Sequence, residues 1–182
     1  MQVLKKIGLT LLSLVVVLLI VSFFLPSKVT VVRTAVLKAP TPLVFEQVNM
    51  LQNWEKWSPW HKIDPQMLLS YEGPDGGKDA KYNWFSIHPN VGNGSLTITE
   101  SVPNQRIDTK MQFEGESDGL AYYLFEETPE GTKVTWTMEA DMGSNPINKY
   151  FGLMMDGMLG PDFERGLENL RNVVEQPTAV AR

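Results

Sequence analysis

Few side chains in this sequence could carry out acid–base or nucleophilic chemistry. His61 and His88 are its only imidazoles, and an imidazole suits general-base catalysis because its pKa lies near neutral pH. His61 closely follows a group of tryptophans and is the better candidate, although a histidine in a proline-containing turn is more often structural. The chain has no cysteine, which excludes disulfides, thiolate metal sites and a cysteine nucleophile. The sequence therefore assigns no catalytic residue, no metal ligand and no cofactor.

Inward-facing tyrosines or carboxylates on strands would be the alternative source of catalytic groups. The candidates are Tyr71, Tyr82, Tyr122 and Glu126, depending on register, and Glu100, which shares the phase of Leu96 and Ile98. A carboxylate inside an apolar cavity would have a raised pKa and would be a strong functional signal. For Glu100 the competing interpretation is a strand-end position that reaches water, because Pro103 follows closely.

Tryptophans and methionines are the more promising group, and the chemistry they favour is binding of an apolar ligand. Trp54, Trp57 and Trp60 would form either an aromatic lid or a packing plug at one end of a cavity. Methionines near residue 155 suit either a pocket for varied ligands or ordinary core packing. The residues that we expect at a hydrophobic ligand site are Trp57, Trp60, Tyr82, Trp84, Ile98, Met111, Tyr122, Trp136, Met154, Met155 and Met158.

An uncharged apolar run at residues 7–25 precedes everything else and is long enough to cross a bilayer as a helix. A cleaved secretory signal is the alternative, but the small-x-small cleavage pattern is missing before Pro26. Lys5 and Lys6 favour an inside N-terminus, a bias that Lys28 and Arg33 weaken. We therefore expect a membrane anchor at residues 1–27, with the following domain on the outer, periplasmic or extracellular, side of the cell membrane.

Alternating apolar and polar residues indicate that residues 28–175 contain a sheet. A strand is expected at residues 29–38, then two short helical segments, the first with Thr41 as N-cap and the second interrupted by Pro59. Six further strands, separated by turns, predict an antiparallel meander. They are expected at residues 67–72, 80–87, 91–102, 105–114, 118–127 and 132–141. The side chains expected on the buried face are Leu96, Ile98, Ile107, Met111, Phe113, Val134, Trp136 and Met138, and those on the wet face are Thr97, Thr99, Asp108, Lys110, Gln112, Thr135, Thr137 and Glu139.

Helical periodicity at residues 146–175 predicts the long helix that covers the sheet. Its apolar side would carry Tyr150, Phe151, Met154, Met155, Met158 and Leu159, and after a break at Gly160-Pro161 the stripe would resume at Phe163, Leu167, Leu170 and Val174. The fold class is therefore α+β, with a curved seven-stranded antiparallel sheet wrapped on a long C-terminal helix, two short helices after the first strand, and an N-terminal transmembrane helix. Residues 176–182 would be a loose tail.

The order of these elements, together with several motifs, resembles the START/Bet v 1-like superfamily (SRPBCC), and within it the bacterial polyketide cyclase/dehydrase-like members. The motifs are NWEKWSPW at residues 53–60, VGNGS at 91–95, ESVPN at 100–104, TKVTW at 132–136 and DFERGLENL at 162–170. The resemblance covers residues 28–175 and implies a helix-grip fold with a deep apolar cavity for lipids, polyketides or other hydrophobic ligands. None of the motifs is a catalytic signature, so no catalytic set is carried over.

Together these observations predict membrane-anchored binding of a hydrophobic small molecule, lipid or polyketide-like, between the sheet and the C-terminal helix. A net charge of −5 argues against nucleic acid as a partner. Two alternatives stay open at this point. One is a cyclase or dehydratase that acts in the same cavity, and the other is a protein-interaction domain whose cavity is filled by Trp and Met side chains.

Overall fold

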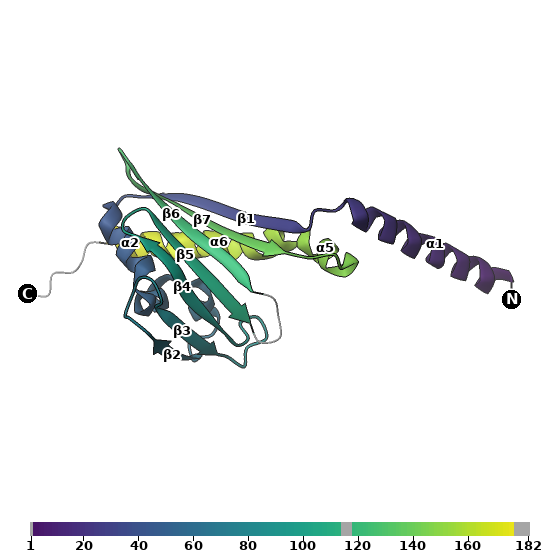
Figure 1. The fold of residues 1–182 in the computed structure, drawn as a ribbon, viewed down its shortest axis with the longest axis horizontal. Coiled ribbons are helices and arrows are strands. Elements are labelled where there is room, and N and C mark those ends of the chain that lie inside the picture. The colour runs from purple at the N-terminus through teal and green to yellow at the C-terminus, as the bar shows by residue number, and fades with distance from the viewer. Residues whose placement is uncertain (1, 114–117, 177–182) are drawn as a thin grey trace, which may run out of the picture.

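A computed structural model describes residues 2–113 and 118–176 (Figure 1). A long N-terminal helix projects from one end of an α+β domain, in which the sheet curves around a C-terminal helix. In order, the elements are α1 (Gln2–Phe24), β1 (Lys28–Leu37), α2 (Thr41–Asn49), η1 (Leu51–Asn53), α3 (Trp54–Trp57), α4 (Pro59–Ile63), β2 (Leu68–Glu72), β3 (Lys81–Phe85), β4 (Gly94–Val102), β5 (Arg106–Phe113), β6 (Gly119–Thr128), β7 (Gly131–Asp141), α5 (Pro146–Gly152) and α6 (Met155–Glu175). The predicted α+β helix-grip fold is confirmed.

The sheet has seven antiparallel strands in the order β1-β7-β6-β5-β4-β3-β2. Strands β2 to β7 lie side by side in chain order as an antiparallel meander, and β1 forms the other edge of the sheet by pairing with β7 along the whole length of β1. The predicted inner face is the one that faces the core, with Phe113 only half-buried. Thr137 is an exception to the predicted wet face, because it is buried on β7 between Val32 of β1 and Tyr122 of β6.

A β-bulge in β4 corrects the expected phase of Glu100. The register between β4 and β5 shifts between Ile98 and Glu100, so Glu100 no longer follows the inward alternation. Its side chain is exposed and lies 3.8 Å from Lys78 Nζ. Glu100 is therefore a surface residue, in agreement with the interpretation that it reaches water near the end of a strand.

The C-terminal helical region breaks at residues 153–154, between α5 and α6, and the predicted break at Gly160-Pro161 is wrong. Proline inside a helix removes one backbone hydrogen bond. Here the helix is supported from β1, because Arg33 donates to Asp156 Oδ1 at 2.8 Å and to Glu164 Oε1 at 2.7 Å, one on each side of Pro161. A side chain at Gly160 would collide with this guanidinium, so the glycine makes room for the support.

The two halves of the helical region bury their apolar residues differently. Phe163, Leu167, Leu170 and Val174 are buried against the sheet as predicted. Nearer the N-terminal end Met155 is buried and Leu159 is partly buried, whereas Phe151, Met154 and Met158 are largely exposed. The predicted single apolar stripe is therefore wrong for this half.

The predicted start of α2 is also shifted by one residue. Pro40 is the N-cap and Thr41, which was the predicted N-cap, is the first helical residue.

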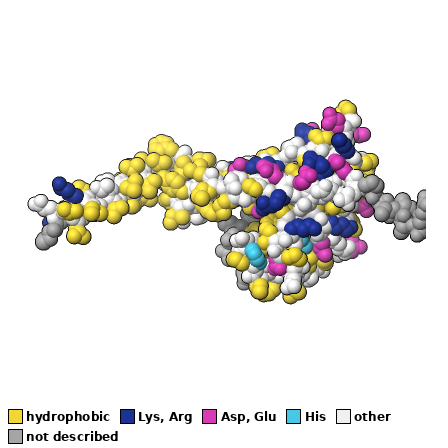
Figure 2. Space-filling view, turned by 180° about the vertical axis from the view of Figure 1, so that it is seen from behind, with side chains coloured by type: hydrophobic (Ala, Val, Ile, Leu, Met, Phe, Trp, Pro, Cys, Tyr) yellow, Lys and Arg dark blue, Asp and Glu magenta, His cyan; other side chains and the backbone are white. Residues whose placement is uncertain are grey.

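By length and composition α1 could cross a membrane, and almost none of it is buried (Figure 2). The last turns of α1 contact α5, where Tyr150 Oη donates to the Leu18 carbonyl at 2.8 Å and Lys149 Nζ donates to the Ser22 carbonyl at 3.1 Å. The division into an anchor at 1–27, a domain at 28–175 and a tail at 176–182 stays a prediction, and residues 1, 114 and 177–182 of the predicted elements lie outside the described residues.

Candidate ligand-binding cavity

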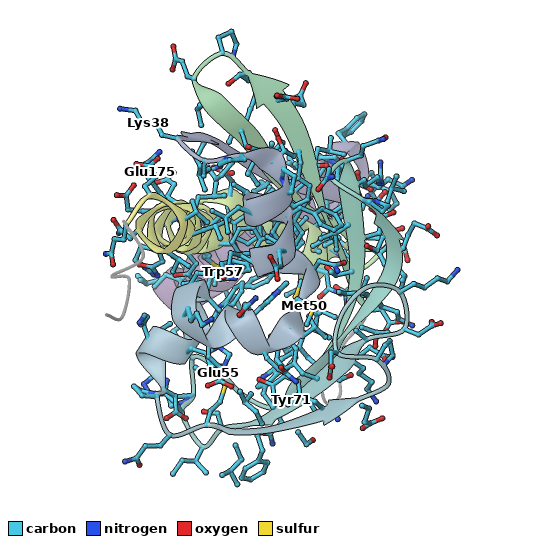
Figure 3. All side chains as sticks on the ribbon, turned by 90° about the vertical axis from the view of Figure 1, so that its left-hand side faces the viewer. Lys38, Met50, Glu55, Trp57, Tyr71 and Glu175 are labelled. Carbon is cyan, nitrogen blue, oxygen red and sulfur yellow. The ribbon has the colours of Figure 1, made fainter. Side chains whose placement is uncertain are left out.

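The space between the sheet and α6 is filled at one end. There Trp54 and Trp57 are buried completely, and each indole nitrogen donates to a backbone carbonyl of α2: Trp54 to Val48 at 2.8 Å and Trp57 to Gln47 at 3.0 Å. Figure 3 shows Trp57 between the short helices and α6, which is seen end-on. These two tryptophans are a packed plug and not a lid, because their rings and their donors are already satisfied within the protein.

The other end of the same space is hollow. A cavity of about 630 Å³ lies between the N-terminal half of α6 and the inner face of β3–β7, bounded by α4 and α5. Its apolar lining consists of Trp60, Met67, Trp84, Val91, Leu96, Met111, Phe113, Gly119, Met138, Ala140, Met142, Phe151, Met155, Met158, Leu159 and Phe163. Its polar lining consists of His61, Tyr82, Asn90, Asp118, Asp141 and Asn148. A mainly apolar wall with a few polar groups is typical of small-molecule sites.

A stacked aromatic pair separates the cavity from the plug. Phe163 of α6 lines the cavity and lies flat on Trp136 of β7, with ring centroids 3.9 Å apart and planes 6° apart. Trp60 packs edge-on against the same indole at 5.9 Å. The helix can come this close because position 166 is glycine, where a Cβ would lie 2.7 Å from Trp136 Cζ3.

His61 is the polar group of most chemical interest in the cavity. Neither of its ring nitrogens has a hydrogen-bond partner in the described part of the chain, and both are buried. Burial lowers the pKa of His61, against the attraction of Glu55, so the imidazole is neutral at pH 7. A neutral imidazole offers one donor and one acceptor, which a ligand hydroxyl or carboxyl group could use.

The other titratable groups differ in environment. Burial raises the pKa of Tyr82, so its phenol keeps its proton at physiological pH. Hydrogen bonds from Lys110 and Gln112 lower the pKa of Asp118, which is therefore a carboxylate. Asp141 accepts a hydrogen bond from the backbone N–H of Gly143 at 2.9 Å. Both aspartates were missed as lining residues, since each lies at a strand end where alternation gives no face.

Six of the eleven residues expected at the ligand site line the cavity: Trp60, Tyr82, Trp84, Met111, Met155 and Met158. Their contact with a ligand stays a prediction. Trp57, Ile98 and Trp136 are packed in the core instead, and Met154 is 61% exposed outside the cavity. Tyr122 lies on the outer face of the sheet, where its hydroxyl donates to Glu139 at 3.4 Å and Arg106 covers its ring at 4.7 Å. Its expected inward orientation is therefore wrong.

The remaining chemical candidates lie away from the cavity lining. Tyr71 on the edge strand donates to Glu55 Oε1 at 2.9 Å, and Glu126 pairs with Lys133 at 2.6 Å on the surface. His88 is not among the lining residues. Within residues 2–113 and 118–176, no three histidine or acidic side chains come together as metal ligands.

A curved antiparallel sheet that grips a long helix around an apolar cavity defines a helix-grip domain of the hydrophobic-ligand-binding kind. Residues 28–175 match the family described as "Polyketide cyclase / dehydrase and lipid transport", and the chain belongs to that family. The recognition made from the motifs is confirmed. No curated protein matches the chain.

Solved structures show the same fold at low sequence identity. A protein from Chromobacterium violaceum aligns with a TM-score of 0.56 and 19% identity, over 82% of this chain and 99% of its own. One from Rhizobium leguminosarum gives a TM-score of 0.60 and 20% identity, over 82% and 96%. The Aha1 dimer from Colwellia psychrerythraea gives 0.58 and 14%, over 83% and 99%. At these identities the likeness concerns the fold alone.

Proposed function

We propose that this protein is a membrane-anchored carrier or sensor that binds a single-chain lipid or another hydrophobic small molecule in the cavity. The observation that supports this most strongly is a cavity of about 630 Å³ walled by methionine, leucine and aromatic side chains. That volume is within the range of about 300–1,000 Å³ for small-molecule sites. Burial of an apolar ligand needs area and shape more than reactive groups, and the lining supplies area.

His61 gives the proposed ligand a polar contact. A hydrocarbon chain alone would leave both imidazole nitrogens without partners, which is costly in a buried position. A ligand with a hydroxyl or protonated carboxyl group beside its chain would satisfy at least one of them. The expected ligand is therefore amphiphilic, with its apolar part against Met111 and Met138 and its polar group toward α4.

The membrane anchor is part of the proposal. With Lys5 and Lys6 before the apolar run, α1 would cross the cell membrane with its N-terminus inside and the domain outside. Tethering raises the effective concentration of the cavity at the bilayer surface. A single cysteine at Glu130, introduced into this cysteine-free chain, tests the orientation. A membrane-impermeant maleimide should label it in intact cells, and labelling only after lysis would reverse the assignment.

The binding proposal is tested by mass spectrometry of an organic extract of the purified full-length protein. Met158→Trp should obstruct the cavity, which Met158 lines, and should lower the amount of co-purified ligand. Leu153→Trp is the matched control, because Leu153 is about as exposed as Met158 but does not line the cavity. Equal ligand in both variants, or an empty wild-type protein that binds no added fatty acid, would contradict the proposal and favour a protein-interaction domain.

A cyclase or dehydratase is the second candidate, and the specific observation in its favour is His61. A neutral imidazole in an apolar cavity can act as a general base. The test compares the mass and the chromatographic retention of the extracted ligand before and after prolonged incubation with the protein, because dehydration removes one water whereas simple ring closure leaves the mass unchanged. A change in either property that His61→Gln abolishes, while the ligand stays bound, would establish catalysis.

A further inference from the structure

An apolar patch surrounds the junction of α5 and α6, on the side of the domain that meets α1. It consists of Ile147, Phe151, Leu153, Met154 and Met158, which are between 48% and 77% exposed. From Pro146 to Met155 the only charged side chain is Lys149, and its ammonium group is engaged with the Ser22 carbonyl. Such a concentration of large apolar side chains on a soluble surface indicates a partner.

Contacts with α1 fix where this patch lies relative to a bilayer. The hydroxyl of Tyr150 donates to the carbonyl of Leu18, which is six residues before the end of α1 at Phe24. At a rise of about 1.5 Å per residue, that carbonyl is about 9 Å along the axis from the end of the helix. The whole of α1 is about 34 Å long by the same rise, close to the hydrocarbon thickness of about 30 Å. In a bilayer centred on α1, the Leu18 carbonyl would lie about 7 Å inside the hydrocarbon boundary, and the Ser22 carbonyl, which accepts from Lys149, about 1–2 Å inside it. A spanning α1 therefore holds α5 at the outer edge of the hydrocarbon layer, next to the headgroups.

The residues beside this contact suit that position. Phe23 and Phe24 at the end of α1 are exposed and extend the apolar surface toward the patch. Tyrosine is enriched at membrane interfaces because its ring is apolar and its hydroxyl is polar, and Lys149 can extend its charged end in the same way. Figure 1 shows α5 next to the end of α1, while the α2 end of the domain lies far from it.

The patch is also the rim of the cavity. Phe151 and Met158 are exposed on the patch and line the cavity at the same time, and buried Met155 lies between them on the inner side. An acyl chain that leaves the bilayer beside these residues would reach the cavity without crossing water. The alternative route, through the aqueous phase, would expose the whole chain to water at a free-energy cost that rises with every CH₂ group.

We propose that the α5–α6 patch rests in the bilayer interface and is the entry through which a membrane lipid's acyl chain passes into the cavity. This inference rests on the proposed anchor and ligand class and adds the route between them. The partner is the lipid bilayer itself. Exposed Ile147 and Met154 contact lipid without lining the cavity, whereas Phe151 and Met158 contact both lipid and ligand.

The docking half is tested with single cysteines in the full-length protein, which has none of its own. Each carries an environment-sensitive fluorophore in two sets of phosphatidylcholine vesicles, with acyl chains brominated either near the headgroup or near the terminal methyl group. Met154→Cys tests the patch, Leu14→Cys the middle of the anchor, and Glu130→Cys the distant β6–β7 turn. The shallow bromolipid should quench the label at position 154, the deep bromolipid should quench the label at position 14, and neither should quench the label at position 130.

The other possible quenching patterns show which part of the proposal fails. Quenching at Leu14 without quenching at Met154 overturns the docking and leaves the anchor. The reverse pattern supports docking of the patch but overturns a spanning α1. If neither label is quenched, both proposals fail.

The entry half is tested by the rate at which a pyrene-labelled fatty acid moves from vesicles into the protein. The double variant Ile147→Glu/Met154→Glu places charge in the interface and should slow uptake several-fold, with unchanged equilibrium binding of the fatty acid added from detergent. Leu68→Glu, at an equally exposed apolar residue on edge strand β2, is the matched control and should keep the wild-type rate. An unchanged rate in the double variant overturns the route, whereas no binding by the wild type in any format overturns the ligand class.

Discussion

The ring of Phe163 stacks on the ring of Trp136 with 3.9 Å between centroids, and this contact fixes the long helix to the sheet where packed core gives way to cavity. On one side of the pair are the buried indoles of Trp54 and Trp57, and on the other is open volume. A helix-grip domain needs such a boundary, because a wholly filled space would leave no room for a ligand and a wholly empty one would forfeit its packing energy.

Phe163→Ala should therefore be among the most damaging single changes. It removes the stack and enlarges the cavity at once, and we expect a loss of about 3–5 kcal/mol in the free energy of unfolding. Denaturant titration of the full-length protein in detergent, followed by tryptophan fluorescence, measures it. Phe85→Ala, at an exposed position of β3, should cost about 1 kcal/mol or less. Similar losses in both variants would contradict the role given to the stack.

Much of the fold was predictable because the sheet alternates regularly. Leu96, Met111 and Met138 fall on the inner face by period two alone, and turns separate the strands. Alternation cannot tell which inward residues touch a void and which are packed, so Ile98 and Trp136 were expected at the ligand site although they belong to the core. That distinction depends on how closely α6 approaches each strand, which Gly166 decides in three dimensions.

Two predictions from the sequence, the inward orientation of Tyr122 and the helix break at Gly160-Pro161, are wrong for identifiable physical reasons. Tyr122 shares its phase with the exposed charge of Glu126, whereas Tyr123 shares the phase of buried Phe125, so the strand itself carried the signal for the outward orientation of Tyr122. The error at Gly160-Pro161 arose differently. The dipeptide is a strong helix breaker in isolation, and the support from Arg33 comes from a strand more than a hundred residues away.

Two glycines of α6 should respond oppositely to alanine. Gly157→Ala adds a methyl group in open space and should stabilise the protein by about 1 kcal/mol through helix propensity. Gly160→Ala should lose that gain, because the three nearest atoms to the new Cβ all belong to the Arg33 guanidinium, which would be displaced from its carboxylates. Thermal unfolding of the two variants measures the difference.

Arg33→Ala supplies the control for this pair. In that background the collision is removed, so Gly160→Ala should become stabilising, and the double-mutant cycle reports the coupling between the two positions. Additive effects of Arg33→Ala and Gly160→Ala would show that the guanidinium does not constrain position 160.

His61 should make stability depend on pH. Its pKa is lowered in the folded protein, so below the unfolded value of about 6.5 the unfolded chain binds more protons than the folded one. The contribution of His61 is therefore fully present above that pH and is lost as the pH falls toward the folded pKa. Unfolding measured between pH 7.5 and 5 should show a smaller loss in His61→Gln than in His88→Gln, which removes the histidine that does not line the cavity. Equal losses would contradict burial of His61 in the folded protein.

The length of the cavity should set the ligand that it prefers. Met111 lines the inner wall, and Met111→Ala removes a long side chain from it, so the preferred chain in a series of fatty acids should become longer. Tyr122→Ala is the control. It removes a larger side chain, but Tyr122 lies on the opposite face of the sheet from the cavity, so the preferred chain length should stay unchanged. Competition against a pyrene-labelled fatty acid measures both series. A shift in the Tyr122→Ala series, or none in the Met111→Ala series, would place the ligand outside the cavity, because only contact with the chain end can make affinity depend on its length in this way.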